Sequence, residues 1–438
     1  DVISFQTPNW VEAAVINLAA ALGGYVINPI VIIYRDAEVE LMLADSQSRL
    51  LFITEAFRGY DGRAMMDRIR SKVPELQHVF FVRGSGHNTY EALLTSGRGK
   101  PAPDVKVDAN WIKLVLYTSG TTGRPKGVLH SHNTITAVVE GMARHWGIQD
   151  NDSVLTPSPI THITGYCNGL ESPFIAGTRT VLMESWNADE AVKLIDEYQV
   201  VATLAATPFL QELAAVAKKT GCRLPSLKVF PCGGAPVPPN LIREANTAFA
   251  QPCAFRMFGS SEAPLVTVGY RGSANAELAA VSDGAIGDYE VKIVDEAGLA
   301  VEPGTDGEIL VRGPAMFVGY ADSAQTSDAI TKDGYFLTGD IGHLMSEDTL
   351  VITGRKKDLI IRGGENISAK EIEDVLHRHP QVAEAAVVAI PHVRLGEGIM
   401  AFIVARADSV PNAASIAAFV DASGLARQKI PERFAFVA

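Results

Sequence analysis

Short β-rich runs alternate with helical patterns from the start of the chain to about residue 260, and this alternation constrains the fold more than any other feature. Some runs are followed by clear helical patterns, as at 187–199 and at 209–221, which ends on Gly221. Strands that alternate with helices predict a parallel α/β architecture. The strand-like runs occupy 49–53, 78–82, 113–119, 153–159, 178–183, 200–207 and 227–234.

The pattern changes after residue 287. The runs 289–298, 307–313 and 349–355 alternate between apolar and polar residues and are separated by Gly and Asp turns, which predicts a β-rich region. After Arg355, two helical patterns and three strand patterns predict a further unit. Since 438 residues exceed what one core of roughly 250–300 residues supports, we expect two domains. They are a large N-terminal domain with parallel α/β subdomains and a β-rich region, over 1–356, and a small mobile α+β domain, over 357–438.

Charge and cysteine content narrow the function classes. The formal net charge of -12 argues against a broad nucleic-acid surface, although it allows a locally positive pocket for an anionic ligand. None of the four cysteines forms a CxxC pair, so we expect buried thiols in a reducing cytoplasm. The most apolar stretch, 10–34, contains Glu12, Asn17 and Pro29, which favours a buried helix and a strand over a membrane span.

The run 116–127, "LYTSGTTGRPKG", follows a strand and is rich in Gly, Ser and Thr. Its glycines allow consecutive backbone N–H groups to face one anion, while the hydroxyls and Lys126 add further donors. Lys126 lies between Pro125 and Gly127, so the run does not fit the phosphate loop G-x-x-x-x-G-K-[ST]. The pattern predicts a site for nucleotide phosphates of another kind.

The sequence resembles the adenylate-forming superfamily, most of all its acyl-CoA synthetases. The run 117–128 is similar to the superfamily signature. Further motifs follow in the superfamily's order and extend the resemblance over essentially the whole chain. They are "CGGAPV" at 232–237, "MFGSSEAP" at 257–264, "DGYFLTGDIG" at 333–342, "GRKKDLIIRGGENIS" at 354–368 and "IPHVRLGE" at 390–397.

The resemblance implies a set of ATP- or AMP-binding residues. Phe258 stands where the superfamily usually has Tyr on one face of adenine, and Ser261 stands where it has Thr beside the α-phosphate. Asp340 and Arg355 are expected at the ribose, and Glu262 is the expected magnesium ligand, a role that suits a hard oxygen donor. Lys126, Thr122, Glu262 and His162 are the implied catalytic residues. The remaining nucleotide contacts are Thr118, Ser119, Gly120, Thr121, Gly123, Gly233, Gly234, Ala235, Gly259 and Ser260.

The acyl and thiol sites are implied in the same way. The acyl pocket is expected at His162, Ile163, Gly165, Thr207, Pro208 and Phe209, and the coenzyme A channel at Gly363, Gly364 and Glu365. The apolar character of "ATPF" and "APLV" favours a neutral hydrophobic acid: medium-chain, alicyclic or aromatic. Lys357 is the expected hinge of the small domain, while His130 and His132 are interpreted as structural.

The resemblance implies an acid–thiol ligase. A carboxylate and Mg-ATP give acyl-AMP and pyrophosphate, and the acyl group then passes to the thiol of coenzyme A. ATP, Mg²⁺ and coenzyme A are the expected cofactors, and the carboxylic acid is the expected small-molecule partner. Fatty acid metabolism is the expected context. Whether the protein forms a homodimer is left open. The start of the large domain, and the end of the small one with the superfamily's catalytic lysine, are expected outside the 438 residues. Two alternatives remain: an adenylation domain that loads a carrier protein, and a non-catalytic nucleotide-binding homologue.

Overall fold

The computed structural model describes residues 1–102, 104–118, 125–235, 237–362, 365–407, 409–423 and 425–437. Its first unit is a seven-stranded sheet with the order β17-β8-β7-β2-β1-β3-β6. The five strands from β7 to β6 are parallel, while β8 and β17 extend the sheet in antiparallel pairing. The strands are β1 Val2–Gln6, β2 Val26–Pro29, β3 Ser48–Thr54, β6 His78–Val82, β7 Ile112–Thr118, β8 Lys126–Ser131 and β17 Gly319–Tyr320.

The second unit contains two parallel sheets that lie side by side. One has the order β10-β9-β11 and the other pairs β12 with β13. Isolated bridges, such as Ala205 to Cys232, join the chain around β11 to the chain around β12. The strands are β9 Ser153–Thr156, β10 Arg179–Leu182, β11 Val200–Thr203, β12 Phe230–Cys232 and β13 Ala254–Arg256.

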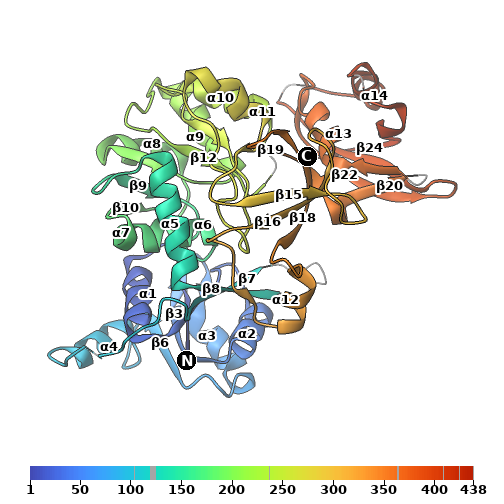
Figure 1. Cartoon of the computed structure of the whole chain (residues 1–438). Coiled ribbons are helices and arrows are strands. Elements are labelled where there is room, and N and C mark those ends of the chain that lie inside the picture. Colours follow the sequence, from blue (N-terminus) through green and yellow to red (C-terminus); the bar gives the residue numbers. More distant parts are fainter. Residues whose placement is uncertain are drawn as a thin grey trace.

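Two further sheets account for the β-rich region and the C-terminal unit (Figure 1). The first has the order β14-β19-β18-β16-β15, and the second has the order β21-β20-β23-β22 with β24 beside β23. A small hairpin, β4–β5, lies apart from them. The strands are β4 Ala56–Phe57, β5 Tyr60–Asp61, β14 Gly284–Ala285, β15 Glu290–Val294, β16 Gly307–Arg312, β18 Phe336–Ser346, β19 Thr349–Arg355, β20 Leu359–Arg362, β21 Glu365–Ser368, β22 Val382–His392, β23 Gly396–Ala405 and β24 Arg433–Val437.

Helices cover these sheets, and several begin and end where the sequence places caps. Ser131 caps α5 through the backbone N–H of Thr134, and glycines in the left-handed conformation end α5 and α9. The helices are α1 Val11–Gly23, α2 Asp36–Asp45, α3 Gly62–Ile69, α4 Tyr90–Gly97, α5 His132–Trp146, α6 Ile163–Gly165, the π-helix Tyr166–Glu171, α7 Ser172–Ile175, α8 Ala188–Glu197, α9 Thr207–Thr220, α10 Pro239–Ala248, α11 Ala276–Val281, α12 Ser323–Ala329, α13 Ala369–Leu376 and α14 Ala413–Ala422, with 3-10 turns at Arg70–Lys72, Ser273–Asn275, Lys356–Asp358 and Arg427–Lys429.

Buried side chains form separate cores on the two faces of the large sheet and in the C-terminal unit. Helices α1 and α5 pack in the main core, α2 and α3 in the second core, and α13 and α14 in the third. The third core draws all its buried members from residue 360 onward. The fold class predicted from the sequence, parallel α/β followed by a β-rich region and a small α+β unit, is therefore confirmed.

Two differences from the sequence prediction lie beside the phosphate run. Strand β8 was not predicted, and it places His130 in the sheet, so that the helix begins only at His132. The two-residue strand β17 comes from far along the chain to pair with β8.

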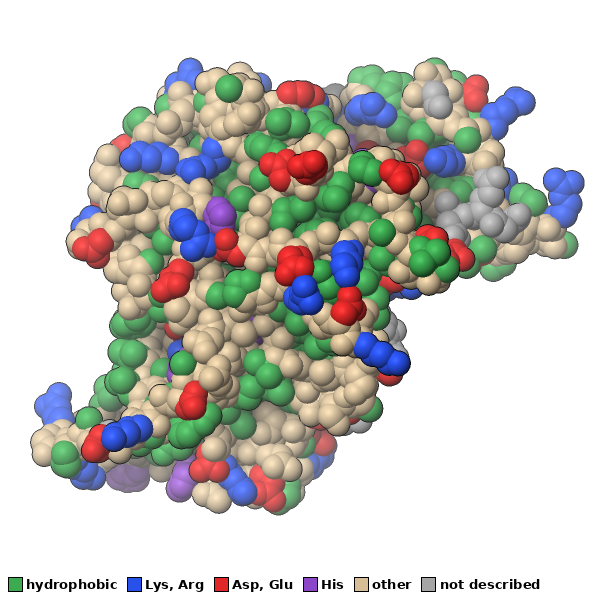
Figure 2. All heavy atoms as spheres, viewed as in Figure 1, with side chains coloured by type: hydrophobic (Ala, Val, Ile, Leu, Met, Phe, Trp, Pro, Cys, Tyr) green, Lys and Arg blue, Asp and Glu red, His purple; other side chains and the backbone are tan. Residues whose placement is uncertain are grey.

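Acidic and basic side chains are interspersed over the face shown in Figure 2. Within the described ranges, no helix combines the length and the apolar character that crossing a bilayer requires.

Candidate active site

One cavity of about 1660 Å³ lies between the large units and the C-terminal unit. Its walls come from α5, from the segment around α6, from the chain after β12 and β13, from β18 and β19, and from α13 and β22. The motifs that carry the resemblance therefore meet at one place in three dimensions. Most of them lie at the ends of strands, where the backbone leaves a sheet and side chains can converge.

Lys126, Glu262 and Tyr320 form a charged cluster on the cavity wall. The Tyr320 hydroxyl donates to Oε1 of Glu262 at 2.9 Å, and the Lys126 ammonium lies 4.9 Å from the centre of the Tyr320 ring. Pairing of Tyr320 with Val128 across β17 and β8 sets this arrangement. Thr118 also lines the cavity, whereas Ser119, Gly120, Thr121, Thr122 and Gly123 lie outside the described residues.

The residues expected at adenine come from two stretches that line the cavity and pack closely against each other. Gly233, Gly234 and Ala235 line the cavity after β12, as do Phe258, Gly259, Ser260 and Ser261 after β13. A Cβ on Gly233 would lie 2.6 Å from the carbonyl oxygen of Met257, so the two stretches approach closely only because this residue is glycine. The two stretches thus line the cavity side by side, and Phe258 contributes an aromatic residue to this part of the wall.

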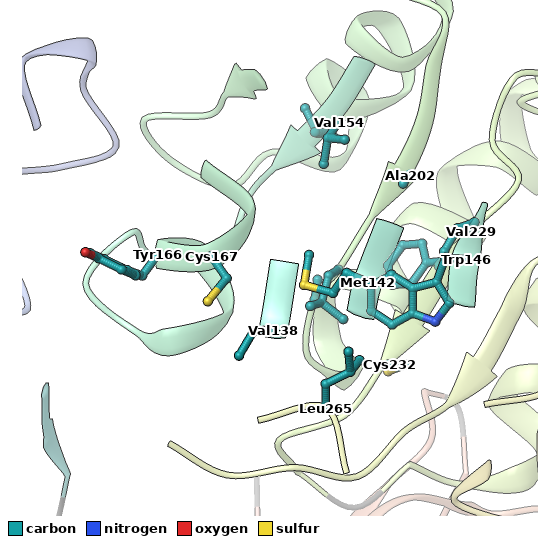
Figure 3. Close-up of a cluster of buried hydrophobic side chains, with 14 of the residues drawn as sticks. Val138, Met142, Trp146, Val154, Tyr166, Cys167, Ala202, Val229, Cys232 and Leu265 are labelled. Atoms are coloured by element: carbon teal, nitrogen blue, oxygen red, sulfur yellow. The ribbon is translucent and has the colours of Figure 1, made fainter. Parts of the chain in front are cut away.

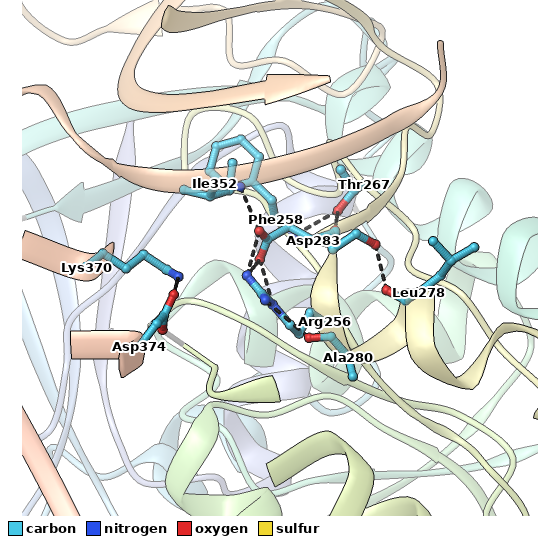
Figure 4. Close-up of polar contacts among 10 residues, drawn as sticks. Arg256, Phe258, Thr267, Leu278, Ala280, Asp283, Ile352, Lys370 and Asp374 are labelled. Carbon is cyan, nitrogen blue, oxygen red and sulfur yellow. Dashed lines mark hydrogen bonds and ion pairs between the residues drawn. The ribbon is translucent and has the colours of Figure 1, made fainter. Parts of the chain in front are cut away.

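A buried ion pair, Arg256–Asp283, lies beside this part of the wall (Figure 4). Nη2 of Arg256 donates to both carboxylate oxygens of Asp283 at 2.7 Å, and Nη1 donates to the carbonyl of Ala280. Thr267 accepts from the backbone N–H of Phe258 at 2.7 Å and donates to the carbonyl of Asp283. Thr267 therefore links the Arg256–Asp283 ion pair to the backbone of Phe258. Neither residue of the pair stands out in the sequence, because the two are 27 positions apart.

Asp340 and Arg355, both expected at the ribose, contact each other. They face one another across β18 and β19, and Nε of Arg355 lies 2.8 Å from Oδ1 of Asp340. Burial raises the pKa of Asp340 above its ordinary value, and the neighbouring guanidinium opposes this shift. Arg355 is exposed while the Asp340 side chain is almost buried, so a ligand can reach the pair from the cavity.

The residues expected in the acyl pocket are only partly brought together. His162, Ile163 and Phe209 line the cavity, but Gly165, Thr207 and Pro208 do not. Gly165 packs against the preceding turn, where a Cβ would meet the carbonyl oxygen of Pro159 at 2.1 Å. Pro208 is exposed on the first turn of α9. His162 lines the cavity and stays exposed there, and partial desolvation of its imidazole lowers its pKa.

His130 and His132 lie off the cavity wall. His130 is fully buried, and its Nε2 donates to the carbonyl of Ser261 at 2.7 Å while Thr134 contacts Nδ1 at 3.0 Å. Burial lowers the pKa of His130 to about 4. In the described part of the chain, no group of three or more His, Cys, Asp or Glu side chains is placed to hold a metal ion.

Lys357 lies on the cavity wall, in the 3-10 turn Lys356–Asp358 that joins β19 to β20. These strands belong to different sheets, so the turn marks the point where the chain passes into the C-terminal unit. The predicted channel glycines Gly363 and Gly364 lie outside the described residues, and Glu365 begins β21. Ile361 and Arg362, which precede Gly363 in the sequence, do not line the cavity.

Several residues of the wall were missed in the sequence. Tyr320 carries no motif of its own, and only its pairing with β8 reveals it. The buried residues Val138, Met142 and Trp146 read as an ordinary core face of a helix, yet all three line the cavity. Their spacing was a signal for burial, but not for what they are buried against.

Comparisons with known proteins agree with this geometry. The model of the AMP-binding enzyme family matches residues 1–321, and that of the AMP-binding enzyme C-terminal domain matches 371–438. The medium-chain fatty-acid–CoA ligase of Escherichia coli is 31% identical over 442 residues, which covers 100% of this chain and 78% of that protein. The indoleacetate–CoA ligase of Aromatoleum aromaticum is 33% identical over 399 residues, covering 90% of this chain and 76% of that protein.

Among solved structures, ATP-bound MatB from Rhodopseudomonas palustris has a TM-score of 0.87 at 25% identity, covering 100% of this chain and 84% of that chain. The apo form of the same protein has a TM-score of 0.78 over the same shares at 25% identity. The chain therefore belongs to the family of AMP-binding enzymes, within the adenylate-forming superfamily and similar to its acyl-CoA synthetases.

Proposed function

We propose that the protein activates a neutral hydrophobic carboxylic acid with ATP and transfers the acyl group to coenzyme A. In the first step a carboxylate oxygen bonds to the α-phosphorus, the bond to the β-phosphate oxygen breaks, and pyrophosphate leaves. In the second step the coenzyme A sulfur bonds to the acyl carbon, AMP leaves, and the thiol proton goes to solvent. Positioning and charge neutralisation supply most of the catalysis in such a scheme.

One observation carries the proposal: a single cavity is lined by Lys126 and Glu262, by the Asp340–Arg355 pair, and by the apolar residues Val138, Met142 and Trp146. A nucleotide carries a polyanionic phosphate chain, which matches Lys126 and Glu262, and a ribose diol, which matches the Asp340–Arg355 pair. The apolar surface of an acyl group matches the apolar residues. The names of the relatives in Escherichia coli and Aromatoleum aromaticum support a hydrophobic acid, since one is a medium-chain fatty-acid ligase and the other an indoleacetate ligase.

Each side chain has a chemical role in this proposal. Lys126 compensates phosphate charge, and Asp340 accepts from the ribose hydroxyls after exchanging its contact with Arg355. The lowered pKa of His162 keeps its imidazole neutral near pH 7, so it contacts the acid's carboxylate by hydrogen bonding. Phe258 offers a flat apolar face to adenine.

The residues present also fit Mg²⁺. This ion is commonly held by one or two carboxylates together with phosphate oxygens and water, so a single carboxylate at the phosphates suffices. Glu262 is such a carboxylate, and Tyr320 contacts only its Oε1 among the hydrogen bonds of the described residues. When bound there, Mg²⁺ supplies charge neutralisation at the phosphates.

The thiol step needs a different set of groups at the same place. In the present conformation α13 and β22 contribute to the cavity wall, whereas Ile361 and Arg362, which precede Gly363 in the sequence, do not. We infer a rotation of the C-terminal unit about Lys357 that brings Gly363 and Gly364 to the acyl-adenylate. The greater similarity to the ATP-bound than to the apo form of MatB supports assigning the present arrangement to adenylation.

Pyrophosphate exchange with a panel of acids, run with and without coenzyme A, tests the proposal on the full protein. We expect exchange with neutral hydrophobic acids, and formation of the acyl-CoA and AMP when coenzyme A is added. Exchange without any acyl-CoA would favour a carrier-loading adenylation domain. Nucleotide binding without exchange for any acid would instead indicate a non-catalytic homologue.

A further inference from the structure

One face of α5 forms an apolar wall of the cavity. Val138, Met142 and Trp146 all line it, and a spacing of four residues places them on the same side of the helix. The rise of an α-helix makes this wall ~12 Å long from Val138 to Trp146. Polar contacts lie at the other end of α5. There His130, two residues before the helix, donates a hydrogen bond to the carbonyl of Ser261.

The opposite walls of this recess are also apolar. Cys167, on the π-helix, lies at the Val138 end of the row in Figure 3, and Leu265 lies beneath it. Both line the cavity, together with Leu204. Leu265 approaches α5 so closely that a Cβ on Gly141 would meet its Cδ2 at 3.0 Å. The recess is therefore narrow across α5 and elongated along it.

Trp146 closes the far end. Its side chain is only 3% exposed, and its Nε1 donates to the carbonyl of Val268 at 3.0 Å. The indole also packs against Phe255 with ring centroids 6.2 Å apart. Neither Phe255 nor Val268 lines the cavity, so the recess ends at the indole. A hydrogen bond on one edge and an aromatic contact together hold the ring in this position.

The recess also lacks a cation for a second carboxylate among its described residues. The Lys and Arg side chains that line the whole cavity are Lys126, Arg256, Arg355, Lys357 and Lys370. Arg256 is next in sequence to Phe255, which packs against Trp146, but Asp283 and the carbonyl of Ala280 engage its guanidinium. A charged acyl tail would therefore be desolvated in the recess without a partner.

We propose that Trp146 is the closed end of the acyl site and sets its length, so that the preferred substrates are neutral acids of about eight to ten carbons, unbranched or aryl-substituted. The ~12 Å wall accommodates about nine carbons, since an extended chain advances ~1.3 Å per bond. This assignment rests on the proposed acid–CoA ligase activity. It adds a length limit and the residue that imposes it.

The test compares saturated acids from butanoic to hexadecanoic in the coenzyme A ligase assay. We expect wild-type kcat/KM to be highest for octanoic or decanoic acid. Trp146→Ala removes the closed end, so the kcat/KM ratio of tetradecanoic to octanoic acid is expected to rise at least about tenfold. Met142→Trp fills the middle of the recess and is expected to move the optimum to butanoic or hexanoic acid.

Trp111→Ala is the matched control, because this tryptophan is 48% exposed and lies off the cavity. It is expected to leave the length profile unchanged. Thermal unfolding of each variant identifies one that does not fold, and Met142→Trp keeps the test decisive if Trp146→Ala is such a variant. An unchanged optimum in the folded variants would overturn the role of Trp146 while leaving the ligase activity intact. Absence of acyl-CoA formation by the wild type with every acid would instead overturn the proposed function.

Discussion

The hydroxyl of Tyr320 donates to Oε1 of Glu262 at 2.9 Å, while the ring of the same tyrosine lies 4.9 Å from the Lys126 ammonium. A single side chain thus contacts both charged groups that are proposed to act on the phosphates. Its position comes from β17, which pairs with β8 next to Lys126. The hydroxyl limits the orientations of the carboxylate, and the ring limits those of the ammonium.

Tyr320→Phe separates these two contacts, because it keeps the ring and removes the hydroxyl. We expect kcat/KM for ATP in pyrophosphate exchange to fall about tenfold, which is ~1.4 kcal/mol of barrier. The magnesium concentration for half-maximal activity is expected to rise, since Glu262 loses the donor that orients it. Tyr320→Leu also removes the ring and is expected to be more impaired. Full activity of the Phe variant with an unchanged magnesium titration would contradict a positioning role.

Glu262→Gln keeps the size of the side chain and removes its charge. We expect adenylation to fall at least about 100-fold, because charge neutralisation at the phosphates carries much of the catalysis. Asp328→Asn is a suitable control, since Asp328 is an exposed carboxylate on the same cavity wall with no proposed role. Circular dichroism checks that both variants fold. Near-normal exchange by the Gln variant at saturating magnesium would remove Glu262 from the metal role.

The sequence predicts the parts of this molecule that local pattern determines. The alternating strands and helices, the glycine that ends α9 and the apolar face of α5 follow from spacing and turn chemistry. It does not predict contacts between distant segments. Tyr320 is 58 residues from Glu262, and Arg256 meets Asp283 although 27 residues separate them in the sequence. A buried helix face likewise does not reveal whether a core or a ligand recess lies opposite.

His130 makes stability depend on pH. Its pKa in the fold is about 4, below the ordinary 6.5, because the ring is buried. Between pH 6.5 and 4 the unfolded chain binds a proton that the fold excludes, so the free energy of unfolding falls as the pH falls. The full effect is about 3 kcal/mol. We expect denaturant midpoints to decrease from pH 7 to pH 4.5.

His130→Gln offers a donor for the carbonyl of Ser261 without a titrating ring, so its pH dependence is expected to be weaker than that of the wild type. His87→Gln is the control, since His87 is an exposed histidine and the change is expected to leave the slope as it was. If the unfolding free energy depended on pH equally in the wild type and both variants, burial of His130 would not be the source of the pH dependence.

Lys357→Pro tests the hinge. Proline fixes φ near -65°, which suits the 3-10 turn that Lys357 now occupies. We expect adenylation to stay within about tenfold of the wild type and thioester formation from added acyl-AMP to fall by orders of magnitude. Lys357→Ala leaves the backbone free to change and is expected to be mild in both assays. Equal losses in both steps for the Pro variant, or a severe loss for the Ala variant, would contradict a hinge at this residue.

Leu265 lines the proposed acyl recess with a φ of 58°, a left-handed conformation that costs a leucine roughly 1–2 kcal/mol and costs glycine almost nothing. Enlarging a ligand site usually weakens the fold, because buried methyl groups are lost. At Leu265 the relief of backbone strain offsets part of that loss when the replacement is glycine. Enlarging the recess at Leu265 is therefore expected to cost less stability than truncating Val138 or Met142, where the helical backbone gives a shortened side chain no such compensation.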